Sequence, residues 1–322
     1  MLVLVMVLWL VVASVALTVN PIIAIMAHPF KNNTSDYIAA SYVKWIESAG
    51  GRVVPIPYSA SNETIKSIFR SVNGVLFPGG SAWLNQQAAY VYELALGAND
   101  RGEYFPIWGT CLGFEWLVEL TSAKGHDILS KVDALNLSLP INYTENAKSS
   151  RLFAFKPDLY APLTNKPLTI NSHKYGITPS GFKSSLALSS FYNILATSVD
   201  RQGVEFIAAI EAMKYPFYGV QFHPEKNAYE FGKLSNGYFY DDINHGYEAI
   251  VAGQAFAHFF IAEARKNNHA FATLEKEHEA LIYNYQTTQH KYPTFVEIYE
   301  LPINKTWHYQ AMTRLFRSFF WW

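Results

Sequence analysis

Cysteine is almost absent from this sequence, since Cys111 is the only one among 322 residues. A single cysteine excludes an internal disulfide, so burial of apolar side chains must stabilise the fold. An excess of charge of either sign is also lacking, because 25 basic residues face 26 acidic residues and leave a net charge of -1. Without a basic block, the composition gives no electrostatic case for a nucleic-acid partner. We find no phosphate-binding loop or metal-ligand cluster, and we therefore expect neither a cofactor nor a metal.

Hydrophobic residues make up half of the chain and aromatic residues 16%, which suffices for a large core. Short apolar runs, typical of buried strands, alternate with amphipathic stretches, typical of helices. The predicted strands span 21–28, 52–58, 74–80 and 104–109, and the predicted helices span 36–50, 62–72 and 85–98. Ser35 and Asn62 are expected to cap the first two helices. This alternation predicts a three-layer α/β sandwich with a central, mainly parallel sheet.

The second half of the chain has a weaker pattern. Residues 125–190 are richer in Ser, Pro and Asn, and we interpret them as short strands and loops of the same domain. Further strands are predicted at 191–199, 204–212 and 216–223, and a closing helix at 245–266. Without an internal repeat or a clear linker, one domain over residues 20–300 is the simplest interpretation. Residues 301–322 form an aromatic extension, and its role as a docked strand or an exposed patch stays open.

The chain begins with an uncharged apolar stretch, residues 1–19. Its apolar centre and following small residues predict a secretory signal peptide cleaved near Ala16, although the basic residue usual at the start is missing. A signal anchor is the competing interpretation, but a predicted strand beginning at Pro21 leaves no linker to a membrane. Six Asn-x-Ser/Thr triplets support the secretory route; they begin at Asn32, Asn33, Asn62, Asn136, Asn142 and Asn304. We expect a protein of the secretory pathway without a stable membrane anchor.

Cys111 lies in the run FPIWGTCLGFEWL, residues 105–117. Apolar residues precede it, a helix-like stretch follows it, and Gly109 and Gly113 lie two residues to either side. This pattern is typical of a nucleophile elbow, where closely packed backbones require small residues beside the reactive one. The start of the following helix is expected to favour the reactive thiolate. The alternative is a buried cysteine that acts only as a small apolar side chain.

Three segments with candidate site residues each follow a predicted strand. In α/β sheets of this kind, sites form at the carboxyl ends of the strands. Cys111 follows the strand at 104–109, the turn FPGGS follows the strand at 74–78, and HPEK follows the strand at 216–222. His223 is the candidate base, and Glu225, two residues on along extended backbone, is expected to orient its imidazole. The backbone N–H groups of Gly80 and Leu112 are the candidate donors to a tetrahedral oxyanion.

In this order, FPGG, GTCLGFE and GVQFHPEK resemble the class I glutamine amidotransferase superfamily and its Cys-His-Glu triad. The match narrows to the γ-glutamyl hydrolase family, which PIIAIMAHP, YIAASYVKWIESAGGRVVPI and AEARKNNH also resemble. The resemblance covers about residues 20–290. It implies a flavodoxin-like sheet and a secreted or lysosomal cysteine hydrolase that cleaves γ-linked amides in the poly-γ-glutamate tails of folates and antifolates. It also implies a homodimer.

Where the motifs match, the resemblance implies that Cys111 is the nucleophile, that His223 is the acid and base, and that Glu225 orients the His223 imidazole. It places His173 of TINSHKYG near the substrate, with an exposed loop histidine as the alternative. It also suggests that Tyr37, Glu115 and Lys226 contact the substrate. Lys226 could equally be a surface lysine, and Glu115 could simply pack and hydrogen-bond under the elbow. Residues 82–87 carry no charge, so any cationic groups that hold substrate carboxylates must lie elsewhere.

Two other classes of protein are compatible with these motifs. A glutaminase domain that supplies ammonia to a synthase would share the triad, but no synthase domain follows and a signal-like segment precedes. A secreted binding protein on an inactive hydrolase scaffold is the non-enzymatic alternative. The presence of Cys111, His223 and Glu225 together argues against it, because an inactive scaffold is free to lose them.

Overall fold

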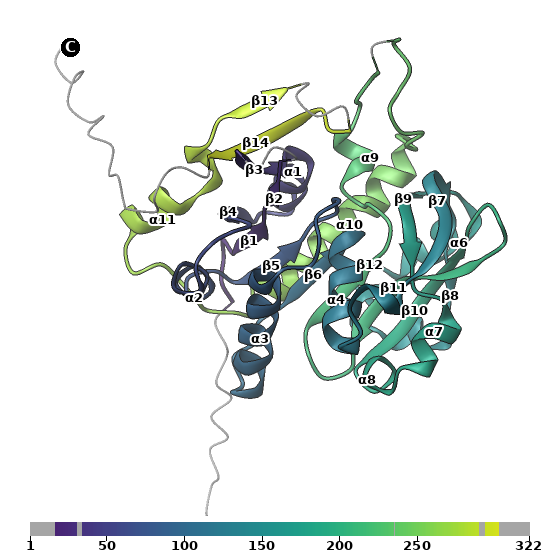
Figure 1. Ribbon diagram of the computed structural model, residues 1–322, viewed down its shortest axis with the longest axis horizontal. Helices are drawn as coiled ribbons and strands as arrows, with labels where there is room; N and C mark the ends of the chain where they lie inside the picture. The colour runs from purple at the N-terminus through teal and green to yellow at the C-terminus, as the bar shows by residue number, and fades with distance from the viewer. Residues whose placement is uncertain (1–16, 31–33, 235, 290–293, 303–322) are drawn as a thin grey trace, which may run out of the picture.

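The centre of the fold is an eight-stranded sheet with the strand order β4-β1-β5-β6-β12-β11-β10-β8 (Figure 1). The computed structural model describes residues 17–30, 34–234, 236–289 and 294–302. The strands of this sheet are β1 Ile22–Met26, β4 Arg52–Ile56, β5 Gly74–Phe77, β6 Ile107–Thr110, β8 Asn142–Tyr143, β10 Tyr192–Val199, β11 Glu205–Ala212 and β12 Phe217–Val220. The five strands from β4 to β12 pair in parallel, and β11, β10 and β8 extend the sheet in antiparallel order.

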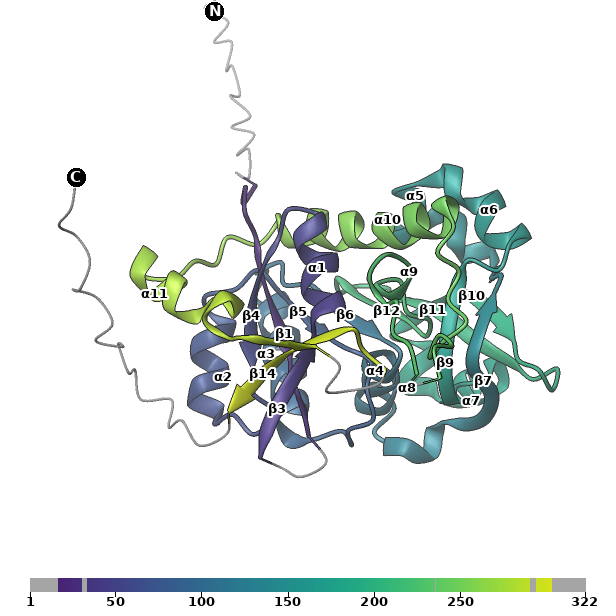
Figure 2. The ribbon, with the colours of Figure 1, turned by 90° about the horizontal axis from the view of Figure 1, so that it is seen from above.

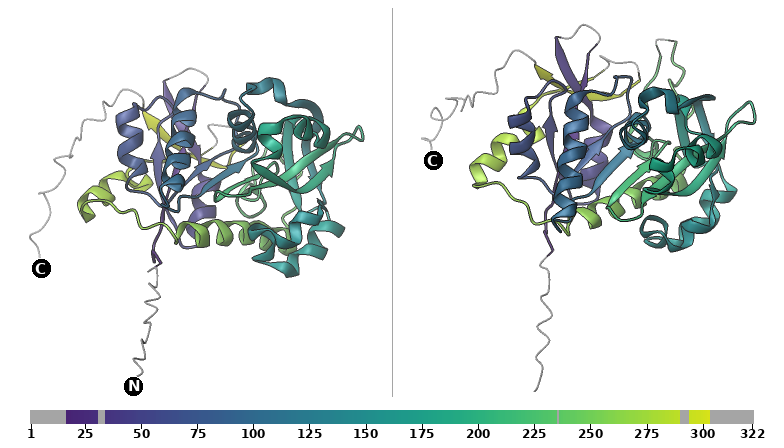
Figure 3. Two further views of the ribbon diagram at one scale, coloured as in Figure 1. Left: turned by 90° about the horizontal axis from the view of Figure 1, so that it is seen from below. Right: turned by 60° about the horizontal axis from the view of Figure 1, so that its bottom comes forward.

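Helices cover both faces of this sheet, as Figures 2 and 3 show. One face carries α1 Ala40–Ser48 and α10 Tyr247–Ala264, and the other carries α2 Asn62–Phe69, α3 Gln86–Asp100 and α4 Leu112–Ser122. The side chains of strand β1 point alternately to the two faces of the sheet, so the strand contributes to the hydrophobic core on each face. Ile23 and Ile25 pack with α1 and α10, whereas Ala24 and Met26 pack with α2, α3 and α4. The predicted three-layer sandwich with a mainly parallel sheet is confirmed.

The prediction of one helix over residues 36–50 was wrong in its first third. Ser35–Ala39 form strand β3, and the helix begins only at Ala40. The reason is a distant partner, because β3 pairs with β14, Glu297–Pro302, in a separate four-stranded sheet. That sheet also contains β2 His28–Pro29 and β13 Thr287–Gln289. Ser35 therefore does not cap a helix.

The expected N-cap of the second helix was wrong by one residue. The hydroxyl of Ser61 accepts a hydrogen bond from the backbone N–H of Thr64, so Ser61 is the cap and Asn62 is the first helical residue. Either residue type is a good N-cap, and the sequence could not separate two neighbours of the same class.

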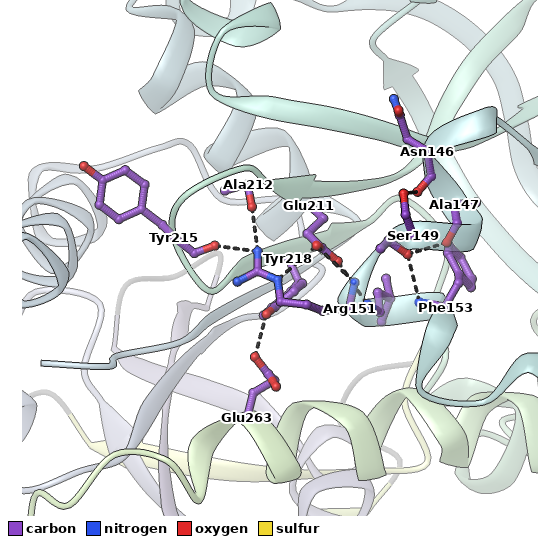
Figure 4. Close-up of polar contacts among 12 residues, drawn as sticks. Asn146, Ala147, Ser149, Arg151, Phe153, Glu211, Ala212, Tyr215, Tyr218 and Glu263 are labelled. Carbon is purple, nitrogen blue, oxygen red and sulfur yellow. Dashed lines mark hydrogen bonds and ion pairs between the residues drawn. The ribbon is translucent and has the colours of Figure 1, made fainter. Parts of the chain in front are cut away.

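The middle segment contains a second small sheet in which β7 Ser130–Leu139 pairs with β9 Thr169–Gly176. Short helices between these strands are joined to the main sheet through Arg151 at the start of α5, Arg151–Ala154 (Figure 4). The Arg151 guanidinium lies 3.0 Å from the Glu211 carboxylate on β11 and donates to the carbonyls of Ala212 and Tyr215. The prediction of short strands and loops for this segment was incomplete, because the segment also contains the short helices α5, α6 Tyr160–Asn165, α7 Pro179–Ser184 and α8 Leu186–Ser189.

The predictions for the two termini fall largely outside the described residues. Residues 1–16 of the predicted signal peptide, the triplets at Asn32, Asn33 and Asn304, and residues 303–322 of the aromatic extension all lie there. Within the described part of the chain, no helix is both long enough and apolar enough to cross a membrane.

Candidate active site

Cys111 lies at a sharp turn between β6 and α4, with backbone angles of φ 51° and ψ -105°. Only a few per cent of non-glycine residues have a positive φ, and functional sites are enriched in them. A Cβ on Gly109 would lie 2.6 Å from the carbonyl oxygen of Gly113, and one on Gly113 would lie 1.9 Å from that of Phe77. The predicted elbow is therefore present, with a glycine required on each side of it.

The glycine turn, Cys111 and the HPEK segment follow strands β5, β6 and β12, which are neighbours in the sheet in that order. Phe77 pairs with Gly109 and Val220 pairs with Thr110, so the strands end at nearly the same level. The backbone N–H of Cys111 donates to the carbonyl of Val220 over 2.9 Å, which fixes the elbow against β12. The sheet thus brings together the glycine turn, Cys111 and the HPEK segment at its carboxyl edge.

His223 and Glu225 form the predicted pair, with 2.8 Å between Nδ1 and Oε1. Both side chains are buried. The expected extended backbone was wrong, because Glu225 is in the αR region and precedes α9, Lys226–Tyr229. A tight turn at Pro224 brings the carboxylate back to the imidazole.

The turn after β5 lies against both catalytic candidates. A Cβ on Gly79 would lie 2.5 Å from Cε1 of His223 and 3.3 Å from Cβ of Cys111, so both side chains converge on this glycine. The N–H of Gly79 donates to the hydroxyl of Tyr42 over 2.7 Å. Gly80 is exposed, and Leu112 opens α4 beside the thiol. Of the two proposed oxyanion donors, Gly80 therefore follows the glycine that approaches Cys111, and Leu112 directly follows Cys111 in the elbow.

The start of α4 favours the thiolate as expected, but it does not determine the net pKa of Cys111. Burial and the nearby Glu115 carboxylate raise the pKa of Cys111 well above its usual value. Lys226 and a hydrogen bond from the N–H of Leu112 lower that pKa, but burial outweighs them. The raised pKa favours the thiol, so attack involves transfer of its proton to a base.

His173 lies in strand β9 and is buried, so the alternative of an exposed loop histidine was wrong. Its Nδ1 lies 2.7 Å from the carbonyl oxygen of Tyr175, and its Nε2 lies 3.1 Å from the Asn171 side chain. Burial lowers the pKa of His173 to about 3, which keeps the imidazole neutral. His173 is close to the site because β9 carries Ile170, whose carbonyl accepts the N–H of His223 over 2.8 Å.

The three remaining candidates are also buried. Tyr37 packs against Phe30, with 4.9 Å between ring centroids. Lys226 is 4% exposed and its Nζ lies 2.5 Å from the Asp241 carboxylate, so it is not a surface lysine. Glu115 accepts a hydrogen bond from the Gln221 amide over 3.0 Å, which agrees with its alternative role under the elbow.

Glu115 gives stability a specific pH dependence. Burial raises its pKa from 4.5 to about 8, so the folded protein retains a proton that the unfolded chain releases. The free energy of unfolding therefore contains a term that falls as pH rises from 4.5 to about 8. Glu115→Gln removes this term, and we expect its stability relative to wild type to increase across that interval.

Urea unfolding at a series of pH values measures this difference. Glu205→Gln, which replaces an exposed carboxylate on β11, is the matched control. Identical pH profiles for Glu115→Gln and the wild type would contradict the assignment of a protonated Glu115.

Two side chains in the site were not found from the sequence. The hydroxyl of Tyr42 lies 3.3 Å from Nδ1 of His223 in addition to its contact with Gly79. The His28 ring lies under the glycine turn, where a Cβ on Gly80 would approach it to 2.6 Å. Burial lowers the pKa of His28 to about 4. Tyr42 lies on the apolar face of α1 and His28 directly follows the apolar run 22–27, so a pattern of hydrophobicity cannot distinguish either from a core residue.

A mainly parallel sheet between two helical layers carries a cysteine elbow and a His–Glu pair at its carboxyl edge, and this arrangement is that of a cysteine hydrolase. Comparison with known proteins gives the family. The family model described as Peptidase C26 matches residues 15–225. The chain belongs to the peptidase C26 family, together with the γ-glutamyl hydrolases.

Three curated relatives illustrate this similarity. γ-Glutamyl hydrolase B of Dictyostelium discoideum is 40% identical over 87% of this chain and 83% of its own length. The γ-glutamyl hydrolase of Bos taurus is 42% identical over 84% of this chain and 85% of its own length. That of Mus musculus is 44% identical over 77% of this chain and 78% of its own length.

Proposed function

We propose that the protein hydrolyses γ-glutamyl amide bonds in the poly-γ-glutamate tails of folates and antifolates. The observation that carries this proposal is the His223–Glu225 pair beside the Cys111 elbow, in a chain about 40% identical to γ-glutamyl hydrolases over most of its length. Such a site supports acyl transfer to a thiol followed by hydrolysis.

In the first half of the reaction, the Cys111 sulfur attacks the γ-carbonyl carbon while its proton passes to His223. The N–H groups of Gly80 and Leu112 stabilise the resulting oxyanion. The C–N bond then breaks, His223 protonates the leaving glutamate nitrogen, and a thioester remains on Cys111. Glu225 orients the imidazole and stabilises its charged form, as the acidic member of such triads does.

In the second half, neutral His223 removes a proton from water, and the resulting hydroxide attacks the thioester. Collapse of the second tetrahedral intermediate returns the proton to sulfur and releases the shortened acid. The raised pKa of Cys111 fits this scheme, since the thiol keeps its proton until His223 accepts it. The buried His173, Glu115 and Lys226 serve as positioning groups around this centre.

The proposed setting is the secretory pathway, with residues 1–19 as a cleaved signal peptide and the lysosome or extracellular space as destination. The density of Asn-x-Ser/Thr triplets supports this route, and Asn62 and Asn142 are exposed. We also propose that the protein is a homodimer, that it acts on folylpoly-γ-glutamates, and that it has no nucleic-acid partner.

Hydrolysis of pteroyl-penta-γ-glutamate at mildly acidic pH tests the proposed substrate. We expect pteroyl products with shorter tails, and chromatography of these products distinguishes internal from terminal cleavage. Free glutamine serves as the second substrate. Release of ammonia from glutamine without cleavage of the pteroyl substrate would favour a glutaminase and contradict the proposal.

A further inference from the structure

Trp83 is a large apolar side chain held in solvent, with 75% of its surface exposed. Its loop is ordered by hydrogen bonds on both sides of the indole. The hydroxyl of Tyr58 donates to the carbonyl of Trp83 over 2.8 Å, and Asn85 caps α3 by accepting the N–H of Ala88 over 2.8 Å. The backbone at Trp83 is thus held in place while the indole stays exposed.

Two further rings continue from Trp83. The indole packs edge-on against His126, with 5.7 Å between centroids and 76° between planes. His126 in turn packs edge-on against Tyr175, with 4.6 Å between centroids. Tyr175 is 37% exposed. These three residues, called the aromatic surface below, connect the loop after β5 with the end of β9.

Short stretches of chain link the aromatic surface to the candidate active site at both ends. Trp83 lies three residues after Gly80, a span of at most about 10 Å of extended chain. Tyr175 lies two residues after His173 on the same strand, and its carbonyl oxygen lies 2.7 Å from Nδ1 of that histidine. Lys131 pairs in register with Tyr175 across the β7–β9 sheet and is exposed, so a cation flanks the rings.

We propose that the aromatic surface binds the planar head of the substrate, its pteridine and p-aminobenzoyl rings, while the γ-glutamyl tail reaches Cys111. This inference rests on the proposed function, which it deepens by assigning the head a subsite. The chemistry of the surface distinguishes between the two ends of the substrate. A tail with a carboxylate on every unit requires several cations, whereas exposed aromatic rings match a flat aromatic group. Lys131 is placed to pair with a carboxylate close to the head.

The test compares two substrates that differ only in the head, pteroyl-penta-γ-glutamate and penta-γ-glutamate. For Trp83→Ala we expect KM for the pteroyl substrate to rise about tenfold, since stacking on one aromatic side chain contributes about that factor. The KM for the head-free peptide and kcat for both substrates are expected to stay at wild-type values. Trp83→Phe, which keeps a ring, is expected to restore most of the affinity.

Tyr247→Ala is the matched control, because it removes an aromatic ring that is 82% exposed at the start of α10. We expect it to leave KM for both substrates unchanged. Equal effects of Trp83→Ala on the two substrates would overturn the assignment in favour of a tail-binding or structural role. Wild-type kinetics for Trp83→Ala would overturn it as well.

A binding measurement distinguishes failure of this inference from failure of the proposed function. Calorimetric titration of the Cys111→Ala variant with pteroylglutamate, which carries the head but no γ-glutamyl amide bond, measures head binding without hydrolysis. Tighter binding with Trp83 present than with Trp83→Ala supports the aromatic surface even if the wild type cleaves neither substrate. Equal or undetectable binding in both proteins overturns it, whatever the outcome of the hydrolysis assay.

Discussion

Replacement of Cys111 by alanine is expected to abolish hydrolysis of pteroyl-poly-γ-glutamate. Loss of the nucleophile in a residue set that acts as a unit costs about ten-thousand-fold or more in kcat. The variant should fold normally, because it loses a single buried sulfur and leaves the glycines of the elbow in place. Steady-state kinetics on variant and wild type, with unfolding curves for both, measure the two properties separately. Comparable turnover by the folded variant would contradict the role of Cys111.

Replacement of Gly113 by alanine has the second large expected effect, and here stability and activity decrease together. The new Cβ would lie 1.9 Å from the carbonyl oxygen of Phe77, within the backbone of β5, where no flexible side chain can yield. Either α4 moves away from β5 or the elbow changes its angle, and we expect destabilisation of about 3 kcal/mol or more. Because α4 carries the N–H of Leu112, any protein that still folds should also have a lower kcat.

Gly97→Ala is the matched control for this prediction. Gly97 lies within α3, and among the described residues, the helix's own backbone apart, its added Cβ would meet only the end of the flexible Arg101 side chain. Alanine in a helix interior is favoured over glycine by about 0.5–1 kcal/mol, so this variant should be as stable as the wild type or more so. Thermal and urea unfolding of the two variants measures the contrast. Equal stability of both variants would contradict the close approach of α4 to β5.

The sequence was sufficient to predict the parallel half of the sheet and the elbow, because both depend on local signals. Strands such as β1 are uninterrupted apolar runs, and glycines two residues on either side of Cys111 reflect a clash that the structure shows directly. Strand β3 could not be predicted in this way. It pairs with β14 some 260 residues away, and its apolar residues fit the start of a helix equally well.

The site was predictable in its residues but not in its electrostatics. Strand ends brought Cys111 and His223 together, because neighbouring parallel strands end at one edge of the sheet. The pKa of Cys111 depends instead on burial and on Glu115, which the helix-dipole argument leaves out. The burial of Lys226 depends on Asp241, which reaches it from a loop 15 residues further on. Tyr42 joins the site from α1, which packs on one face of the sheet.

Identification of the acyl-enzyme tests the central claim most directly. A reaction with pteroyl-penta-γ-glutamate is quenched in acid, digested with a protease and examined by mass spectrometry. We predict a pteroyl-containing acyl group on the peptide that carries Cys111, sensitive to hydroxylamine as a thioester is, and absent from the Cys111→Ala variant. An acyl group on another residue, or undiminished turnover after complete alkylation of Cys111, would contradict the proposed mechanism.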